Sequence, residues 1–126
     1  MSSDNHVLYI EDSVVSAELI KEYIVYINGV DIVIANTGEE GLQMVKSQKP
    51  DLILMDINLP GMNGIETMKA IRAYGPKYAK IPVIAISADA INEEIKRAMQ
   101  AGFDDYLTKP IFFERLKETF QEYGLI

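Results

Sequence analysis

The sequence predicts an α/β protein built on one open, doubly wound parallel sheet with helices on both faces. Two observations predict this fold. Short apolar runs alternate five times with amphipathic helical patterns along the 126 residues, and several of these runs are apolar without interruption. Uninterrupted apolar runs are typical of parallel strands that are buried on both faces. Five such strand–helix units in series favour a parallel sheet whose strands are joined by helices.

The apolar runs define five expected strands, each only a few residues long. They are Val7–Ile10, Asp31–Ala35, Asp51–Met55, Ile81–Ile86 and Asp104–Leu107. No repeat, low-complexity tract or linker interrupts the alternation, and 48% apolar residues are enough to build one core. We therefore expect a single domain over residues 1–126.

Five helical patterns lie between and after these strands. Two begin with capping-box signals, Thr37–Glu40 and Asn63–Glu66, in which a Glu side chain can bond back to the first amide. The third pattern ends at the helix breaker Gly75-Pro76. The apolar stripes of the first, fourth and last patterns are formed by Leu19, Ile20, Tyr23, Ile24 and Ile27; by Ile91, Ile95, Ala98 and Met99; and by Phe112, Leu116, Phe120 and Tyr123.

Composition argues against several classes of protein. The chain has no cysteine, so it contains neither a disulfide nor a thiolate metal site, which suits the cytoplasm, where we expect it. No apolar segment approaches the roughly 20 residues of a membrane span, and the amino terminus lacks a signal-peptide pattern. A net charge of −7 argues against a nucleic-acid surface.

Polar residues follow four of the predicted strands. Glu11 and Asp12 follow the first, Asp56 the third, Ser87 the fourth and Lys109 the fifth. Taken singly, each has a structural explanation as a turn former, a helix cap or a solvated charge. Ligands of open α/β sheets, however, bind outside the carboxyl ends of the strands, so these five side chains are expected to meet at one edge.

Three carboxylates at one edge need a cation. Two carboxylates about 4 Å apart repel by roughly 4 kcal/mol at an effective dielectric near 20, and one lysine cannot balance three of them. Mg²⁺ prefers such oxygen ligands and keeps several waters, whereas the lack of cysteine and the single His6 argue against zinc. Beside such an ion Asp56 can act as a nucleophile toward phosphorus, with Ser87 and Lys109 as donors to the phosphoryl oxygens.

Four motifs together resemble the receiver domain of two-component response regulators. They are Glu11-Asp12, Leu54–Gly61, Ile84–Ala88 and Tyr106–Pro110, and the resemblance runs from His6 to about Tyr123. It implies a flavodoxin-like sheet of five parallel strands in the order 2-1-3-4-5, with five helices. The chain resembles both free-standing regulators and the receivers of hybrid histidine kinases.

The resemblance also implies a phosphorelay role. Asp56 would accept a phosphoryl group from a phosphohistidine on a histidine kinase or a histidine phosphotransfer protein. Asp12, Asp56 and the backbone carbonyl of Asn58 would bind Mg²⁺, with Glu11 acting through water. Such a domain is not an enzyme with a separate substrate. It is a phosphoacceptor that assists its own Mg²⁺-dependent phosphorylation and dephosphorylation.

The remaining motif residues would respond to the phosphoryl group. Lys109 would pair with it, and the Lys109–Pro110 bond would be cis. Ser87 would hydrogen-bond it and draw the loop after the fourth strand inward. Tyr106 resembles the aromatic switch that turns inward with this loop, although an aromatic residue on a strand can also simply pack.

Two further positions bear on the lifetime of the phosphoryl group. Asn58 and Asp89 lie two residues beyond Asp56 and Ser87, and polar side chains there can orient an attacking water, which predicts short-lived phosphorylation. Alternatively, Asp89 caps the following helix. Kinase specificity is expected on residues 13–20 and the loop after the fifth strand. The output, toward an unknown protein target, is expected on the fourth helix, fifth strand and fifth helix.

Three other functions are alternatives to a receiver domain. A phosphatase of the haloacid dehalogenase type would carry a second Asp where Asn58 stands. A nucleotide or flavin binder would want a glycine-rich or hydroxyl-rich loop in place of Glu11-Asp12-Ser13. A phosphorylation-independent pseudo-receiver that only binds partners would lack the phosphoacceptor, the acid pair or the lysine. All of these are present, so that alternative survives as an intact site that is not used.

Overall fold

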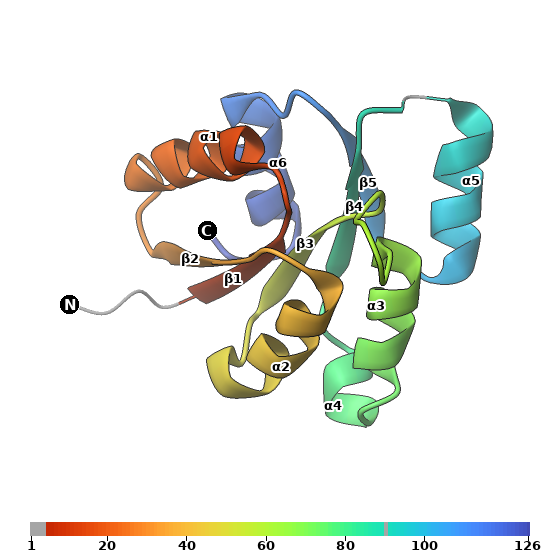
Figure 1. Ribbon diagram of the computed structural model, residues 1–126. Helices are drawn as coiled ribbons and strands as arrows, with labels where there is room; N and C mark the ends of the chain where they lie inside the picture. The colour runs from red at the N-terminus through yellow and green to blue at the C-terminus, as the bar shows by residue number, and fades with distance from the viewer. Residues whose placement is uncertain (1–4, 90) are drawn as a thin grey trace.

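A computed structural model describes residues 5–89 and 91–126, which form a five-stranded sheet with helices on both faces (Figure 1). The strand order is β2-β1-β3-β4-β5 and every neighbouring pair is parallel, which confirms the predicted fold and order. The strands are β1 Asn5–Ile10, β2 Val30–Ala35, β3 Leu52–Asp56, β4 Val83–Ser87 and β5 Asp105–Thr108.

Six helices were found in this part of the chain, where the sequence predicted five. They are α1 Val14–Val25, α2 Gly38–Gln48, α3 Gly64–Arg72, α4 Pro76–Ala79, α5 Asn92–Ala101 and α6 Phe113–Glu122. The additional helix is α4, a single turn that begins at Pro76. Proline stops a preceding helix but also suits the first position of a new one, because its φ is already helical and no amide is needed there. The signal interpreted as a breaker is therefore also a start.

Two apolar cores lie on the two faces of the sheet. In β3, Leu52 and Leu54 point to the core covered by α1 and α6, whereas Ile53 and Met55 point to the core covered by α2, α3 and α5. Successive strand side chains alternate between faces, so a strand buried on both sides must be apolar throughout. This arrangement explains the continuous apolar runs of the sequence.

The strands are shifted slightly from their predicted positions. Asp51 and Asp104 lie just before β3 and β5 rather than inside them. Each carboxylate accepts the backbone N–H of a neighbouring strand, from His6 at 2.8 Å and from Val83 at 2.8 Å. The shift places the carboxyl end of β3 at Asp56 itself.

The helix starts were predicted with mixed success. Asn63 and Glu66 form the expected capping box, with both reciprocal hydrogen bonds present. At the start of α2 the Thr37 hydroxyl accepts the Glu40 N–H at 3.0 Å, but the reciprocal bond is absent among the hydrogen bonds of the described residues. The predicted bond from the Glu40 side chain back to the Thr37 amide is therefore wrong.

The apolar stripes predicted for α5 and α6 include residues that are exposed to solvent. Ile91 and Phe112 are the N-cap residues of these helices and are 59% and 68% exposed, and Met99 is 42% exposed. Helical spacing alone does not reveal where a helix begins, so residues just before it are counted on its face.

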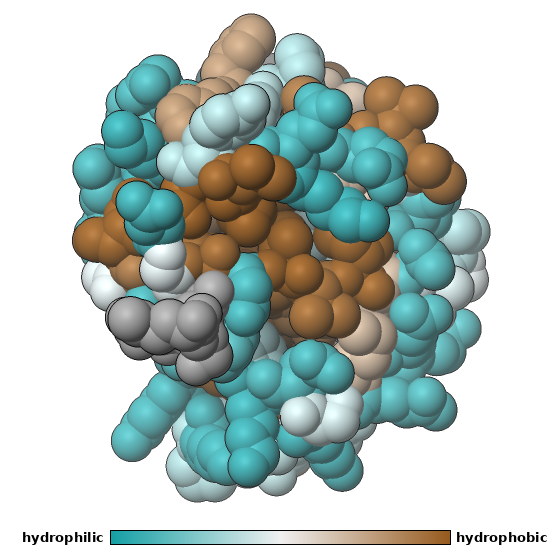
Figure 2. All heavy atoms as spheres, turned by 90° about the vertical axis from the view of Figure 1, so that its left-hand side faces the viewer, coloured by the Kyte–Doolittle hydropathy of each residue, from teal (hydrophilic) through white to brown (hydrophobic). Residues whose placement is uncertain are grey.

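The open edge of the sheet at β2 is partly apolar. Ile32 and Ile34 pack against the core on the α1 side and remain partly accessible. Figure 2 shows apolar side chains gathered across the middle of the face that carries this edge. None of the helices in the described residues has the length and apolar character needed to cross a membrane.

Candidate functional site

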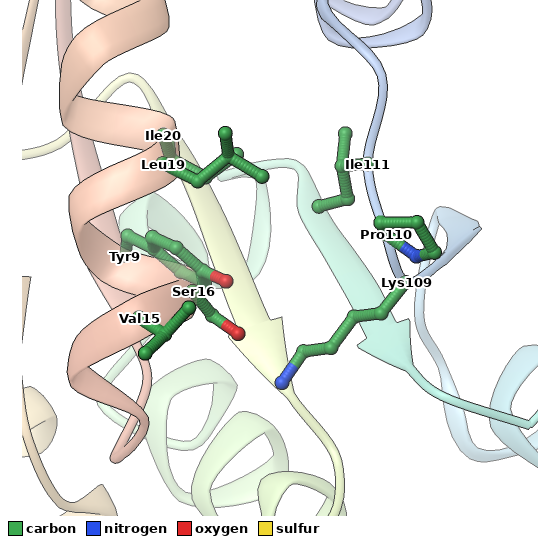
Figure 3. Close-up of a pocket in the computed structure, with 8 residues that line it drawn as sticks. All are labelled: Tyr9, Val15, Ser16, Leu19, Ile20, Lys109, Pro110 and Ile111. Atoms are coloured by element: carbon green, nitrogen blue, oxygen red, sulfur yellow. The ribbon is translucent and has the colours of Figure 1, made fainter.

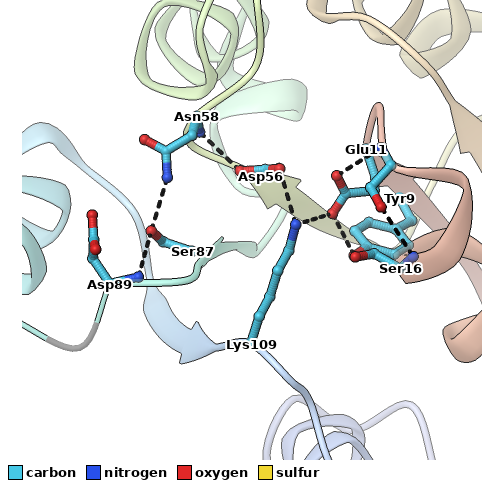
Figure 4. Close-up of polar contacts among 9 residues, drawn as sticks. Tyr9, Glu11, Ser16, Asp56, Asn58, Ser87, Asp89 and Lys109 are labelled. Carbon is cyan, nitrogen blue, oxygen red and sulfur yellow. Dashed lines mark hydrogen bonds and ion pairs between the residues drawn. The ribbon is translucent and has the colours of Figure 1, made fainter.

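The carboxyl ends of four strands bring the predicted site residues together (Figure 4). Asp56 and Ser87 are the last residues of β3 and β4, Glu11 directly follows β1, and Lys109 directly follows β5. Parallel strands end at the same edge of a sheet, so residues far apart in sequence meet there. The predicted convergence is confirmed for these four side chains.

Glu11, Asp12 and Asp56 form one acidic cluster. One carboxylate oxygen from each residue lies within 4.8 Å of the others. Glu11 is 1% exposed and Asp56 5%, whereas Asp12 lies on the surface. Two buried carboxylates this close to a third require compensating positive charge.

Lys109 supplies part of that charge. Its ammonium Nζ lies 2.7 Å from Glu11 Oε1 and 3.1 Å from Asp56 Oδ2. Burial opposes the charge on Lys109, but the hydrogen bond to Glu11 and the charges of Asp56 and Glu11 outweigh burial and raise the pKa of the ammonium. The lysine is therefore charged at neutral pH. The Lys109–Pro110 peptide bond is cis, as predicted.

Glu11 is held from three sides. Its Oε1 accepts the Tyr9 hydroxyl at 2.8 Å as well as the Lys109 ion pair, and its Oε2 accepts the Ser13 N–H at 3.1 Å. Burial raises the pKa of Glu11, as does Asp56, while the bonds from Lys109, Ser13 and Tyr9 act in the opposite direction. The carboxylate is thus oriented before any ligand arrives.

The sequence did not single out Tyr9 for the site. The apolar pattern places this residue in a strand, and its ring is indeed buried in the core. A signal was nevertheless present, because residues i and i+2 of a strand point to the same face. A tyrosine two residues before Glu11 can therefore reach that carboxylate.

Asn58 connects the ends of β3 and β4. Its backbone N–H donates to Asp56 Oδ1 at 2.8 Å, and its side-chain amide donates to Ser87 Oγ at 2.9 Å. The Asp89 N–H also donates to Ser87 Oγ, at 3.1 Å. The Ser87 hydroxyl is completely buried and accepts two hydrogen bonds, so its own proton is the one left to donate.

Tyr106 and Asp89 are linked to each other. Tyr106 is partly buried, and its hydroxyl donates to the backbone carbonyl of Asp89 at 2.6 Å, so β5 is tied to the loop after β4. Ile91 is the N-cap of α5, and no side chain bonds at this cap. The alternative that Asp89 caps this helix is therefore wrong.

The acidic cluster fits a hard divalent cation. Among the described residues it is the single group of three or more His, Cys, Asp or Glu residues with metal-binding geometry. All of its donors are carboxylate oxygens, the chemistry that Mg²⁺ prefers, and no histidine or thiolate takes part. The donor set therefore suits magnesium better than zinc.

A small pocket lies next to this cluster, between α1 and the loop after β5 (Figure 3). Its volume is about 260 Å³, and Tyr9 and Lys109 form part of its wall. Most of the other lining side chains are apolar, and they are Val15, Ser16, Leu19, Ile20, Pro110 and Ile111.

The fold and this site define a class: doubly wound α/β proteins with an acidic, lysine-containing site at the ends of the strands. The response regulator receiver domain family matches residues 7–121. The chain belongs to this family, whose members act with histidine kinases in two-component signalling.

Individual relatives agree with this assignment. The probable C4-dicarboxylate response regulator DctR of Priestia megaterium is 36% identical over 118 residues, which are 93% of this chain and 50% of that protein. The chain therefore spans about half the length of this relative.

Solved structures with a similar fold include response regulators and receiver domains. The chemotaxis protein CheY4 of Vibrio cholerae is 26% identical with a TM-score of 0.87, over 96% of this chain and 99% of that one. The receiver domain of sensor histidine kinase PA1611 from Pseudomonas aeruginosa is 28% identical with a TM-score of 0.86, over 96% of this chain and 98% of that one. The latter structure carries a magnesium ion coordinated in its active-site cleft.

Proposed function

We propose that the protein is a phosphoacceptor of a two-component phosphorelay and that Asp56 is the residue phosphorylated. The observation that carries the proposal is the position of the Asp56 carboxylate. It is 5% exposed, it lies 3.1 Å from the Lys109 ammonium, and it accepts the Asn58 N–H at 2.8 Å. A buried carboxylate with fixed donors beside it is oriented as a nucleophile.

The transfer would proceed by attack of an Asp56 carboxylate oxygen on the phosphorus of a phosphohistidine. A P–O bond forms, the P–N bond breaks, and the imidazole nitrogen keeps the bonding electron pair and takes up a proton. Lys109 would stabilise charge on the phosphoryl oxygens, and Ser87 would donate the hydroxyl proton that its two accepted bonds leave available. Asp56, Lys109 and Ser87 are thus the proposed catalytic group.

Asp12, Asp56 and the backbone carbonyl of Asn58 would hold Mg²⁺, with Glu11 contributing through water. When bound, the ion supplies positive charge that lets an anionic phosphoryl group approach three carboxylates. Asp12 supports this assignment because it is the exposed member of the cluster, where a hydrated ion can bind without disturbing the core.

We further propose that phosphorylation is read through Ser87 and Tyr106. A hydrogen bond from Ser87 to the phosphoryl group would draw its hydroxyl toward Asp56, and with it the Asn58 amide and the Asp89 N–H that donate to that hydroxyl. Asp89 accepts the Tyr106 hydroxyl, so a shift of this loop releases or redirects the tyrosine. The output face would then be α5, β5 and α6, which are the fourth helix, fifth strand and fifth helix of the sequence prediction.

The histidine kinase or phosphotransfer partner would dock on α1 and the loop after β5. Val14 and Val15 at the start of α1 are 74% and 81% exposed, and Val15 lines the pocket of Figure 3. An apolar side chain of the partner can enter this pocket within reach of Lys109. Both partners would be cytoplasmic at the point of contact.

The test is intact mass spectrometry after incubation with Mg²⁺ and acetyl phosphate, for the wild type and for Asp56→Asn. We expect one acid-stable, alkali-labile phosphate adduct on the wild type that requires Mg²⁺ and is absent from the variant. An adduct that persists in Asp56→Asn would place the phosphoryl group elsewhere. No adduct at all would favour a pseudo-receiver that only binds partners.

The same samples, followed over time, test the lifetime of the adduct. Asn58 and Asp89 are polar and lie on the two loops that border Asp56 and Ser87. Side chains of this kind can orient a water for attack on the acyl phosphate, so we expect the adduct to decay without a phosphatase. A half-life of many hours would contradict this role.

A further inference from the structure

Tyr9 carries a hydroxyl that the core does not need. Its ring is the largest completely buried side chain of the described residues and packs among the apolar residues under α1 and α6. Phenylalanine would fill nearly the same volume. A hydroxyl buried in such a place must be hydrogen-bonded, and this one donates to Glu11 Oε1 at 2.8 Å.

Glu11 Oε1 is shared between this hydroxyl and a cation. The Lys109 ammonium lies 2.7 Å from the same oxygen and 3.1 Å from Asp56, so one ammonium is divided between two carboxylates. The Glu11 side chain has no exposed surface, so bulk solvent does not replace a lost partner, and a single Mg²⁺-bound water is the one other group proposed to reach it. Any movement of Lys109 away from Glu11 therefore leaves the remaining donors to hold a buried anion.

We propose that Tyr9 is a positioning residue that holds the Glu11 carboxylate when Lys109 turns toward a phosphoryl group on Asp56. This inference rests on the proposed function. In the free protein Lys109 and Tyr9 hold Oε1 together. Once the ammonium pairs with the phosphoryl oxygens, the Tyr9 hydroxyl is the side-chain donor that stays on Oε1, and the Ser13 N–H stays on Oε2.

Burial of Tyr9 suits this task. A tyrosine hydroxyl is protonated at neutral pH, so this buried group remains a hydrogen-bond donor to the Glu11 carboxylate. A hydrogen bond from a neutral donor to a carboxylate is charge-assisted and becomes stronger when the competing cation leaves. Tyr9 should therefore contribute more to the phosphoryl-bound state than to the free state.

Tyr9→Phe tests this difference because it removes the hydroxyl and keeps the ring. The probe is beryllofluoride, a phosphoryl analogue formed from beryllium chloride and fluoride, titrated in saturating Mg²⁺ and followed by amide NMR. Tyr123→Phe is the matched control, since it removes a hydroxyl that donates to the Asp104 carbonyl at 3.3 Å, away from the acidic cluster. Mg²⁺ alone is titrated into each protein as a second measurement.

We expect Tyr9→Phe to weaken beryllofluoride binding about tenfold, as for loss of one hydrogen bond to a charged group, and to change Mg²⁺ affinity by less than about threefold. Tyr123→Phe should change neither. A merely structural role for Tyr9 would shift both affinities together, and that result, or equal behaviour of the two variants, overturns the proposal. If the wild type itself fails to bind beryllofluoride, the proposed function fails as well, which separates the two cases.

Discussion

Arg72, the last residue of α3, joins three segments that the sheet alone does not hold together. Its guanidinium donates to the carbonyls of Ala79 at 2.7 Å, Ile81 at 3.2 Å and Gly102 at 2.9 Å. It also pairs with Asp104 Oδ2 at 3.0 Å. These contacts fix α4 and the turn between α5 and β5 against α3, so the residue should matter well beyond an ordinary surface arginine.

Arg72→Met removes the guanidinium and keeps most of the aliphatic stem. The three carbonyls lose donors worth about 0.5–1.5 kcal/mol each, at the lower end where water can replace the arginine. The ion pair adds about 0–1 kcal/mol, because the Asp104 side chain is 41% exposed and solvent screens it. We therefore expect a loss of about 2–3 kcal/mol in the free energy of unfolding.

Arg97→Met is the matched control. Arg97 makes one ion pair, with Glu94 at 2.8 Å, and its side chain is 64% exposed. Such an i,i+3 pair on a helix surface contributes about 0.5 kcal/mol or less. Both variants remove a guanidinium that forms an ion pair of similar length. Within the part of the chain that the structure describes, only Arg72 also donates to backbone carbonyls.

Urea unfolding followed by circular dichroism measures both variants. With a slope of about 2 kcal/mol per molar, the midpoint should fall by about 1 M or more for Arg72→Met and by about 0.3 M or less for Arg97→Met. Equal shifts in the two variants would refute the reasoning, because they would show that the bonds to the three carbonyls contribute nothing beyond a surface ion pair.

Two other perturbations follow from the structure. Gly64→Ala would put a Cβ 2.5 Å from the backbone oxygen of Asp56, so we expect a loss of about 1–3 kcal/mol in urea unfolding, and a change below about 0.5 kcal/mol would contradict it. The hydrogen bond and charge of Asp31, 2.8 Å from His6, raise the pKa of His6 above its unfolded value of 6.5. This contribution to stability is complete below that unfolded pKa and is lost as the pH rises through the folded pKa. As the pH rises from about 6.5 through the folded pKa, the wild type should therefore lose stability relative to His6→Gln, and parallel curves would exclude His6 as the cause.

The meeting of the polar strand ends was predictable from the parallel sheet alone, whereas the strand order was implied by the resemblance to receiver domains. In a parallel sheet every strand ends at the same edge, so residues after each apolar run must come together even when the boundaries are wrong by one residue. Asp56 and Ser87 were expected just after their strands and are in fact their last residues. This shift left the site intact.

Local features that depend on a choice between two roles were harder to predict. The Gly75-Pro76 pair both ends α3 and starts α4, and the sequence gives no separate sign for the second role. Asp89 is a plausible cap by residue type, but the observed cap is Ile91. In each case tertiary contacts decide between two conformations that the local sequence permits.

The hydroxyl of Tyr9 is a different kind of omission. An apolar pattern classifies the residue by its ring, which is correct for the core, and disregards the polar atom at its tip. The strand period places that tip beside Glu11. Polar atoms on otherwise apolar strand residues near a site therefore carry information that hydrophobic periodicity alone discards.

The balance of charge in the acidic cluster supports its proposed role as a phosphorylation site. Three carboxylates face one ammonium, whose raised pKa keeps it charged, so the free site carries an excess of negative charge that repels phosphate. A divalent cation would bring the site close to neutral, so that an anionic phosphoryl group could approach Asp56 and pair with Lys109. Because Glu11 and Asp56 are buried while Asp12 is exposed, the cation can bind at the surface and act on a carboxylate inside. We therefore expect phosphorylation of Asp56 to require a bound divalent cation whichever phosphodonor supplies the phosphoryl group.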